Sequence, residues 1–367
     1  MFSYINKKIV HYFLNHNKDI LKEWIFENRR GDEILNHNNQ PNGNTAIVDS
    51  LYLSQNIKNI MNHVAEKRMA SLEKGTEYSE EIVNLQSKLS TQQDLESSWA
   101  QHWLNELKVP FTFHRKNWEN AFILQVLHDH DMFGKHGLGL ACGQEKIPSY
   151  LIQRNCTIVA GDRPFCNDDA IQNGWESTNQ YTLSKESLYH EDLTDRSHFN
   201  NNFTLKYVDM NSLPTELHGD FDFCWSVCAM EHLGSIAAGL NFLKNSLKLL
   251  KPGGISVHTT EFNLLSSHRT IDNWGSVLFT REHLSILEKE IKEIGGEVYP
   301  FNFDMGNGLF DCYFDMPPFP HQSVTGIDSP LPLLKFTPHI KLLIDGIPAT
   351  CVGIIIKKNW FFRVFRG

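Results

Sequence analysis

The sequence lacks the long apolar runs and the clusters of positive charge that mark membrane-spanning and nucleic-acid-binding proteins. No uninterrupted apolar stretch approaches the roughly eighteen residues of a transmembrane helix. The amino-terminal segment is interrupted by Asn6, Lys7, Lys8 and His11, which is unlike a signal peptide. A net charge of −9 argues against a nucleic-acid partner, because the central region has no cluster of Lys and Arg. We therefore expect a cytoplasmic protein without a transmembrane segment, acting on a small or uncharged substrate.

Cysteine is too scarce to build a disulfide framework. The seven cysteines are odd in number and scattered, mostly within apolar runs: Cys142, Cys156, Cys166, Cys224, Cys228, Cys312 and Cys351. This distribution is typical of reduced core residues in a cytosolic protein. With 41% hydrophobic and 21% charged residues over 367 positions, the chain has the composition of a globular protein. Its length suits one large domain with an extension, or two domains.

The most informative stretch runs from His136 to Asp162 and predicts a strand, a tight turn, a helix and a second strand. Small residues occupy the turn at Ala141, Cys142 and Gly143, where they let the backbone approach a ligand closely. Asp162 ends the second strand nineteen residues after Gly143. Nucleotide-binding βαβ units place an acid at this distance to bind ribose hydroxyls. The stretch therefore predicts a mononucleotide-type site.

The segments that follow predict further strands alternating with helices. Apolar runs predict strands ending near 210 and at 221–227, 255–259 and 298–303, helices over 236–250 and 284–294, and a closing hairpin at 340–343 and 351–356. Thr280 is the expected N-cap of the second of these helices, and Asp345-Gly346 the turn of the hairpin. Ligands of open α/β sheets bind beyond the carboxyl ends of the strands.

The amino-terminal third has no catalytic motif and is expected to be a helical extension. Two apolar stripes predict helices: Ile82, Leu85 and Leu89, and then Leu95, Trp99, Trp103 and Leu107. Thr91 is the expected N-cap of the second helix, which should end before Pro110. These stripes would bury against the remaining domain or against a second subunit, so an oligomer through the amino-terminal helices is one expectation.

The order of these signals resembles the class I S-adenosylmethionine-dependent methyltransferases of the small-molecule type. The family's turn follows an acid as acid-x-Gly-x-Gly-x-Gly, and the positions in register here are Gly139, Ala141, Gly143 and Glu145. Cys142 and Gly143 match the common Cys-Gly pair. Gly139 stands where the family has its strand acid, so Glu145 would have to supply that charge, or nothing does. CAMEHLGS resembles the Glu-His motif after the fourth strand. The patterns GLGLACGQE, GWESTNQ, CAMEHLGS and HTTEFN also resemble a bacterial subgroup, for which surface-polysaccharide biosynthesis is a hypothesis.

The resemblance implies an α/β fold, Rossmann-like and doubly wound, with a mostly parallel seven-stranded sheet over residues 111–367 and a helical extension over residues 1–110. It implies S-adenosyl-L-methionine as cofactor. The residues expected to bind it lie at the turn and at the strand ends: Gly139, Ala141, Cys142, Gly143, Glu145, Asp162, Asp209, Met210 and Ser226. A helix is expected over 111–127, where Arg115, Trp118 and Glu119 would line the cofactor pocket or simply pack. Asp209 and Met210 would lie beside the adenine.

Methyl transfer to a hydroxyl requires a base, because the acceptor must lose its proton. His232 of the Glu-His motif is the first candidate, since histidine titrates near neutral pH. Glu261 is the second, and would otherwise orient His232 or bind the acceptor. A metal interpretation would use Glu231, His232, His258 and Glu261, but their spacing matches no metal signature, and no metal is predicted.

Two further segments, NGWESTNQY and the carboxy-terminal tail, have compositions that allow either a binding role or an ordinary structural role. NGWESTNQY, within 163–202, has an aromatic residue and amides that suit a saccharide, or that are ordinary surface residues. The tail KKNWFFRVFRG is either a peripheral membrane contact or a packed strand.

A nicotinamide-dependent oxidoreductase would need a fuller glycine fingerprint. A catalytically inactive methyltransferase-fold scaffold would be consistent with the missing glycines and strand acid.

Overall fold

The computed structural model describes residues 43–72 (side chains from 53), 78–162, 184–265, 269–317, 319 and 337–360. Three predicted features lie wholly or partly outside these residues: the first part of the helical extension expected over 1–110, the NGWESTNQY segment, and the end of the aromatic and basic tail.

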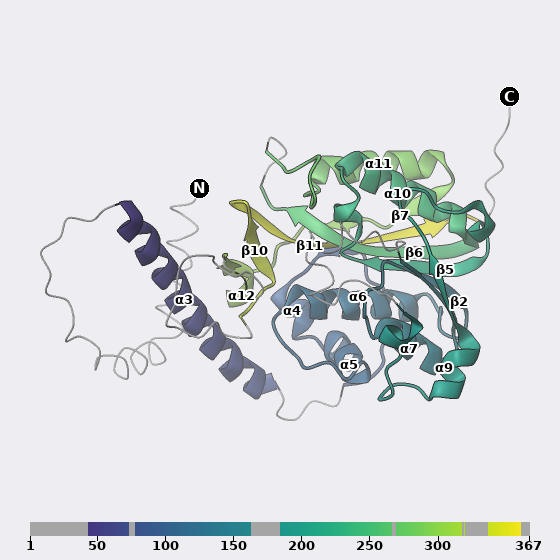
Figure 1. Ribbon diagram of the computed structural model, residues 1–367, viewed down its shortest axis with the longest axis horizontal. Helices are drawn as coiled ribbons and strands as arrows, with labels where there is room; N and C mark the ends of the chain where they lie inside the picture. Colours follow the sequence, from purple (N-terminus) through teal and green to yellow (C-terminus); the bar gives the residue numbers. More distant parts are fainter. Residues whose placement is uncertain are drawn as a thin grey trace, which may run out of the picture.

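A single sheet, seen edge-on in Figure 1, organises the described residues, with the order β4-β3-β2-β5-β6-β11 through its centre. These strands are Phe203–Tyr207 (β4), Thr157–Asp162 (β3), His136–Leu140 (β2), Phe221–Val227 (β5), Leu250–Asn263 (β6) and Ile347–Lys358 (β11). The first five run parallel, and β11 pairs with β6 in the antiparallel sense. The order reverses direction at β2, so the predicted doubly wound, mostly parallel α/β class is confirmed. The carboxyl ends of β2, β3, β5 and β6 share one edge.

Short strands extend the sheet beyond β11. They are Ser87–Leu89 (β1), Gly296–Val298 (β7), Phe301–Asn302 (β8), Phe314–Asp315 (β9) and Lys341–Ile344 (β10). β7 and β10 pair antiparallel with β11, whereas β8 pairs with β1. The single strand expected at 298–303 is therefore divided between β7 and β8, which have different partners. The predicted hairpin between β10 and β11 is confirmed. Its turn residues Asp345 and Gly346 have φ of 48° and 76°, as a two-residue type I′ turn requires.

One predicted helix is wrong. Leu89 lies in β1, which pairs with β11 and β8, and residues 78–86 before it form no helix. The Asp129 carboxylate accepts hydrogen bonds from the backbone N–H groups of Val83 and Leu85, both at 2.9 Å, and so holds this segment extended. Pairing with distant elements overrides the local helical pattern. A segment of the expected extension is therefore an integral part of the sheet.

Two helical layers cover the sheet (Figure 1). One contains Gln92–Leu95 (α4), Ser98–Glu106 (α5), Arg115–Asp129 (α6), Ile147–Gln153 (α7) and Arg196–Asn202 (α9), and the other Ile236–Leu249 (α10) and Arg281–Glu293 (α11). Thr91 and Thr280 cap α4 and α11 as predicted, each accepting a backbone N–H with its hydroxyl. The stripe from Leu95 to Leu107 is buried as expected, although it is divided between α4 and α5.

The α6 helix fills the centre of the first layer and is buried along nearly its whole length. Its Trp118 indole N–H donates to Asp94 at 2.8 Å, and its Gln125 accepts from Trp103 at 2.7 Å, so these polar groups of the apolar layer are paired. The amino terminus of α6 therefore has a fixed position against β11 and the ends of β5 and β6.

The long helix Gly43–Leu72 (α3) lies beside the main body near β10 and Leu309–Cys312 (α12) in Figure 1. Met61, Val64 and Ala65 are buried, and Lys58 pairs with Asp315 at 3.0 Å. Among the described residues, no helix has both the length and the apolar character needed to span a membrane.

Candidate active site

The predicted turn lies between β2 and α7 at the carboxyl edge of the sheet. Ala141 and Gly143 both have φ of 53°, a left-handed conformation that Ala adopts rarely. The Ala141 N–H donates to the Gly161 carbonyl of β3 at 2.7 Å, which joins the turn to the neighbouring strand. Asp162 follows directly, at the end of β3, and is 6% exposed. The turn and Asp162 are thus brought together as the sequence predicted.

Gly139, at the position of the family's acid, has no room for any side chain. A Cβ atom there would lie 2.4 Å from the Cys142 sulfur and 2.5 Å from the Trp225 ring. Gly139 pairs with Trp225 across β2 and β5, and Trp225 is fully buried. The indole therefore occupies the space into which a side chain at position 139 would project.

Glu145 lies two residues beyond Gly143, and its N–H donates to the Cys142 carbonyl at 3.0 Å. Its Oε2 is buried and has no hydrogen-bond partner among the described residues. Burial raises the pKa of the Glu145 carboxyl to about 8, while the Lys116 ammonium opposes the rise. The Trp225 indole also opposes it, but the buried indole N–H makes no hydrogen bond of normal geometry with the carboxyl. An unpaired buried acceptor of this kind costs about 1–3 kcal/mol, which a cationic ligand would recover.

Two other predicted cofactor residues lie past the end of β4. Asp209 is exposed, and its carboxylate accepts the Asn211 N–H at 2.9 Å in a local turn. Met210 is buried at 7% exposure. The Val208 N–H donates to the Asp162 carbonyl at 2.7 Å, so this segment is joined to the end of β3.

Ser226 is placed differently from the turn residues, because its hydroxyl belongs to a buried polar network beneath α10. It lies 2.7 Å from His258 Nδ1, and His258 Nε2 lies 2.5 Å from the Ser256 hydroxyl. Burial lowers the pKa of His258 to about 3, so the ring is neutral. Both ring nitrogens are engaged, so His258 offers no ligand to the metal group considered from the sequence.

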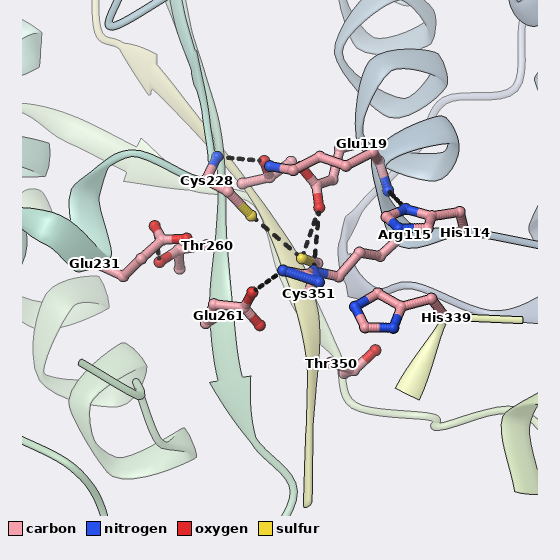
Figure 2. Close-up of polar contacts among 12 residues, drawn as sticks. His114, Arg115, Glu119, Cys228, Glu231, Thr260, Glu261, His339, Thr350 and Cys351 are labelled. Carbon is pink, nitrogen blue, oxygen red and sulfur yellow. Dashed lines mark hydrogen bonds and ion pairs between the residues drawn. The ribbon is translucent and has the colours of Figure 1, made fainter. Parts of the chain in front are cut away.

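The charged residues of α6 meet Glu261 of β6 and the Cys351 thiol of β11 (Figure 2). Cys351 and Trp225 belong to the same buried cluster against α6, so this is the face of the sheet that carries Trp225. An Arg115 nitrogen lies 2.6 Å from Glu261 Oε1, and Lys116 pairs with the fully buried Glu119 at 3.0 Å. The Cys351 thiol donates to Glu119 at 2.8 Å. Because Cys351 has one proton to give, the Cys228 thiol is the donor to Cys351, at 3.3 Å.

Cys228 stands directly after β5 with φ of 46°, a strained backbone for a non-glycine residue. Its N–H is held by the Thr259 carbonyl at 3.0 Å and the Thr259 hydroxyl at 3.1 Å. This turn directs the chain from β5 into the Met230–His232 helical turn (η4) of the Glu-His motif.

The two residues of the Glu-His motif have different surroundings. The Thr260 hydroxyl donates to the buried Glu231 carboxylate at 2.9 Å. His232 is half-buried, and its Nδ1 lies 2.8 Å from the Gly275 carbonyl. A carbonyl only accepts, so Nδ1 carries the proton and Nε2 is the basic nitrogen of the neutral ring.

Glu261 is 4% exposed, and its Oε2 is buried without a hydrogen-bond partner among the described residues. Burial raises the pKa of Glu261 to about 7; the Arg115 charge lowers it and the nearby Glu231 charge raises it. Burial therefore makes this carboxyl easier to protonate than an exposed glutamate.

Sequence reasoning found part of this group and missed the rest. Arg115 and Glu119 were candidates for the pocket and do lie in the cluster, whereas Trp118 points into the core toward Asp94. Cys228 and Cys351 were interpreted only as reduced core residues. The described cysteines form no disulfide, but the contact of Cys228 with Cys351 between the end of β5 and β11 is a tertiary feature. One feature of the sequence could have pointed to this cluster: an acid, Glu119, within a helix whose other buried residues are mostly apolar.

Comparison with known proteins adds distant likenesses of fold. No family model matches the sequence, and no curated protein matches it. A provisionally assigned sarcosine dimethylglycine methyltransferase of Galdieria sulphuraria is 14% identical with a TM-score of 0.39, over 67% of this chain and 86% of the other. A Methanosarcina mazei S-adenosylmethionine-dependent methyltransferase is 12% identical with a TM-score of 0.35, over 65% and 98%.

A third similar structure is the 1,6-didemethyltoxoflavin-N1-methyltransferase of Burkholderia thailandensis with 1,6-didemethyltoxoflavin and S-adenosylhomocysteine bound. It is 12% identical with a TM-score of 0.34, over 64% of this chain and 75% of the other. At such identities and TM-scores these likenesses do not assign an activity, so function must be argued from the site itself.

Proposed function

We propose that the protein is an S-adenosylmethionine-dependent methyltransferase that methylates a hydroxyl of a small molecule or saccharide. The observation that carries the proposal is Glu145, whose buried and unpartnered Oε2 lies beside the left-handed Ala141 to Gly143 turn. Asp162 ends the adjacent strand, where an acid suits ribose hydroxyls. A cation and a ribose within one ligand match S-adenosylmethionine.

The donor supplies an electrophilic methyl group when it is bound, and the chain supplies position and proton transfer. Glu145 would pair with the donor's positive charge, and the small residues at the turn let the backbone approach. Asp162 would accept hydrogen bonds from the ribose hydroxyls. These roles align the donor for in-line displacement, which is the main requirement of methyl transfer.

His232 is proposed as the base that takes the acceptor's proton. The Gly275 carbonyl fixes its tautomer so that Nε2 is basic. Glu261 and Arg115 lie on the same side of the sheet as Trp225 and would orient the acceptor by hydrogen bonds. A polysaccharide precursor is the proposed acceptor class, because its hydroxyls suit both a base and a charged pair.

Calorimetry tests donor binding. We expect S-adenosylmethionine and S-adenosylhomocysteine to bind and NADH not to bind. Asp162→Ala should weaken donor binding about ten- to a hundredfold, since a charge-assisted hydrogen bond contributes about 1.5–3 kcal/mol. Asp220→Ala, at an exposed acid, is the matched control. NADH binding without donor binding, or unchanged affinity in a folded Asp162→Ala protein, would contradict the proposal.

A catalytically inactive scaffold is the second candidate, and the observation that favours it is Trp225 in the space beside Gly139. Labelled donor and fractionated cell extract distinguish the two. Transfer of label to any fraction supports an enzyme, whereas donor binding with no transfer to any fraction supports the scaffold.

A further inference from the structure

Three donor atoms converge at the end of β5, outside the proposed cofactor turn. The Cys228 sulfur and one carboxylate oxygen each from Glu231 and Glu261 all lie within 4.8 Å of one another. The two glutamates are 1% and 4% exposed, and Cys228 is also buried. Three anionic or ionisable groups are crowded here away from water, which is unfavourable unless a positive charge compensates them.

The carboxylates are held as metal-binding carboxylates usually are. One oxygen of Glu231 accepts from Thr260 at 2.9 Å, and one oxygen of Glu261 is held by Arg115 at 2.6 Å. Such outer contacts orient a ligating group while leaving its second oxygen for the metal. The second oxygen of Glu261 is the buried atom that has no hydrogen-bond partner among the described residues.

An overlapping group, Glu119, Cys228 and Cys351, is the weaker candidate. Both Glu119 oxygens are already engaged, one by the Cys351 thiol at 2.8 Å and the other by Lys116 at 3.0 Å. The Glu119 and Lys116 charges also cancel. A cation bound by Cys228, Glu231 and Glu261 would leave the Glu119–Lys116 ion pair in place.

Charge and donor type indicate which cation fits. The Cys228 thiolate and two carboxylates carry three negative charges, and Arg115 carries one positive charge. A divalent cation makes the group neutral. One sulfur with two carboxylate oxygens suits a borderline ion such as Zn²⁺ rather than Mg²⁺ or Ca²⁺. Three protein ligands leave one tetrahedral position open, as in catalytic zinc sites.

We propose that Cys228, Glu231 and Glu261 form a binding site for a divalent transition-metal ion of the zinc type. Binding breaks the Cys228 S–H bond, releases that proton to the buffer and forms a metal–sulfur bond. The site shares Glu261 with the pair proposed to orient the methyl acceptor. Metal binding itself requires neither donor nor acceptor, so its test can fail or succeed separately from the test of methyl transfer.

Cobalt(II) titration of the full-length protein tests the proposal, because thiolate ligation produces an intense near-ultraviolet band. We expect one equivalent of Co²⁺ to give this band and one equivalent of Zn²⁺ to displace it. Calorimetry of Zn²⁺ alone, in buffers of different ionisation enthalpy, should show proton release. Absence of the band from the wild-type protein overturns the proposal, whatever the variants do.

Variants locate the site. Cys228→Ser should abolish the band, and Glu261→Gln should weaken Zn²⁺ binding at least tenfold. Thr260→Val, which removes an outer contact, should weaken it about ten- to a hundredfold. Cys156→Ser, at a buried thiol next to the Met132 carbonyl, is the matched control and should bind normally. A band that survives in Cys228→Ser, or that is lost in the control, overturns the assignment. Circular dichroism melting confirms that each variant is folded.

Discussion

Glu145 provides the sharpest test of the proposed donor site, because its charge state should control donor affinity. Burial raises the Glu145 pKa to about 8. In the free protein at pH 7, about nine in ten molecules would therefore carry the neutral acid. A cationic donor pairs with the ionised form, so donor binding must release the Glu145 proton. Donor affinity should accordingly increase as pH rises toward 8.

The size of the effect follows from the ionised fraction. A carboxyl with a pKa of about 8 is about 1% ionised at pH 6 and about half ionised at pH 8. If only the ionised form binds the donor, affinity increases about fiftyfold across this interval, which is about 2.3 kcal/mol. Measurements go no higher than pH 8, because the donor's own amino group titrates near there.

Glu145→Gln keeps the size of the side chain and removes its charge, so the pH dependence between 6 and 8 should disappear. Calorimetry at pH 6, 7 and 8, in two buffers of different ionisation enthalpy, measures both affinity and proton release. Glu216→Gln, at an exposed acid, is the control and should keep the wild-type slope. A wild-type affinity that does not change with pH, or a Glu145→Gln protein that keeps the slope, would refute the reasoning.

Two further substitutions test catalysis and packing. His232→Ala should lower kcat about 10²- to 10⁴-fold in a labelled-methyl assay while leaving donor affinity nearly unchanged, and normal turnover would make His232 structural. Gly139→Ala should lower the free energy of unfolding by about 1–3 kcal/mol in urea titrations, because its Cβ would lie 2.5 Å from the buried Trp225 ring. The loss should shrink in a Trp225→Leu background, and an equal loss in both backgrounds would exclude the proposed clash.

Local sequence patterns predicted the structure correctly where the residues of a single segment determine its conformation. The α10 helix has an N-cap at Ser235 and buries Ile236, Leu240 and Leu243 on one side, as its spacing predicts. The Asp345-Gly346 pair likewise specifies the hairpin through its backbone conformation alone.

Pattern reasoning failed where pairing with a distant strand decides the structure. Residues 87–89 have a helical stripe of apolar residues before them, yet they pair with β11, more than 250 positions later in the chain. The same strand brings Cys351 opposite Glu261 on β6. Register across β6 and β11 therefore creates the charged cluster, and no local spacing in the sequence encodes it.

The missing strand acid and the presence of Glu145 have a common structural explanation. Trp225 fills the space beside Gly139, so an acid at position 139 would collide with the indole and with the Cys142 sulfur. A chain with tryptophan at 225 must therefore take the negative charge for a cationic ligand from another position. Glu145 lies just beyond the turn, with a buried oxygen that no described residue satisfies. The lost glycines and acid thus argue for a relocated charge as readily as for an inactive scaffold. The pH dependence of donor binding tests the relocated charge, and transfer of label from the donor distinguishes an enzyme from a scaffold.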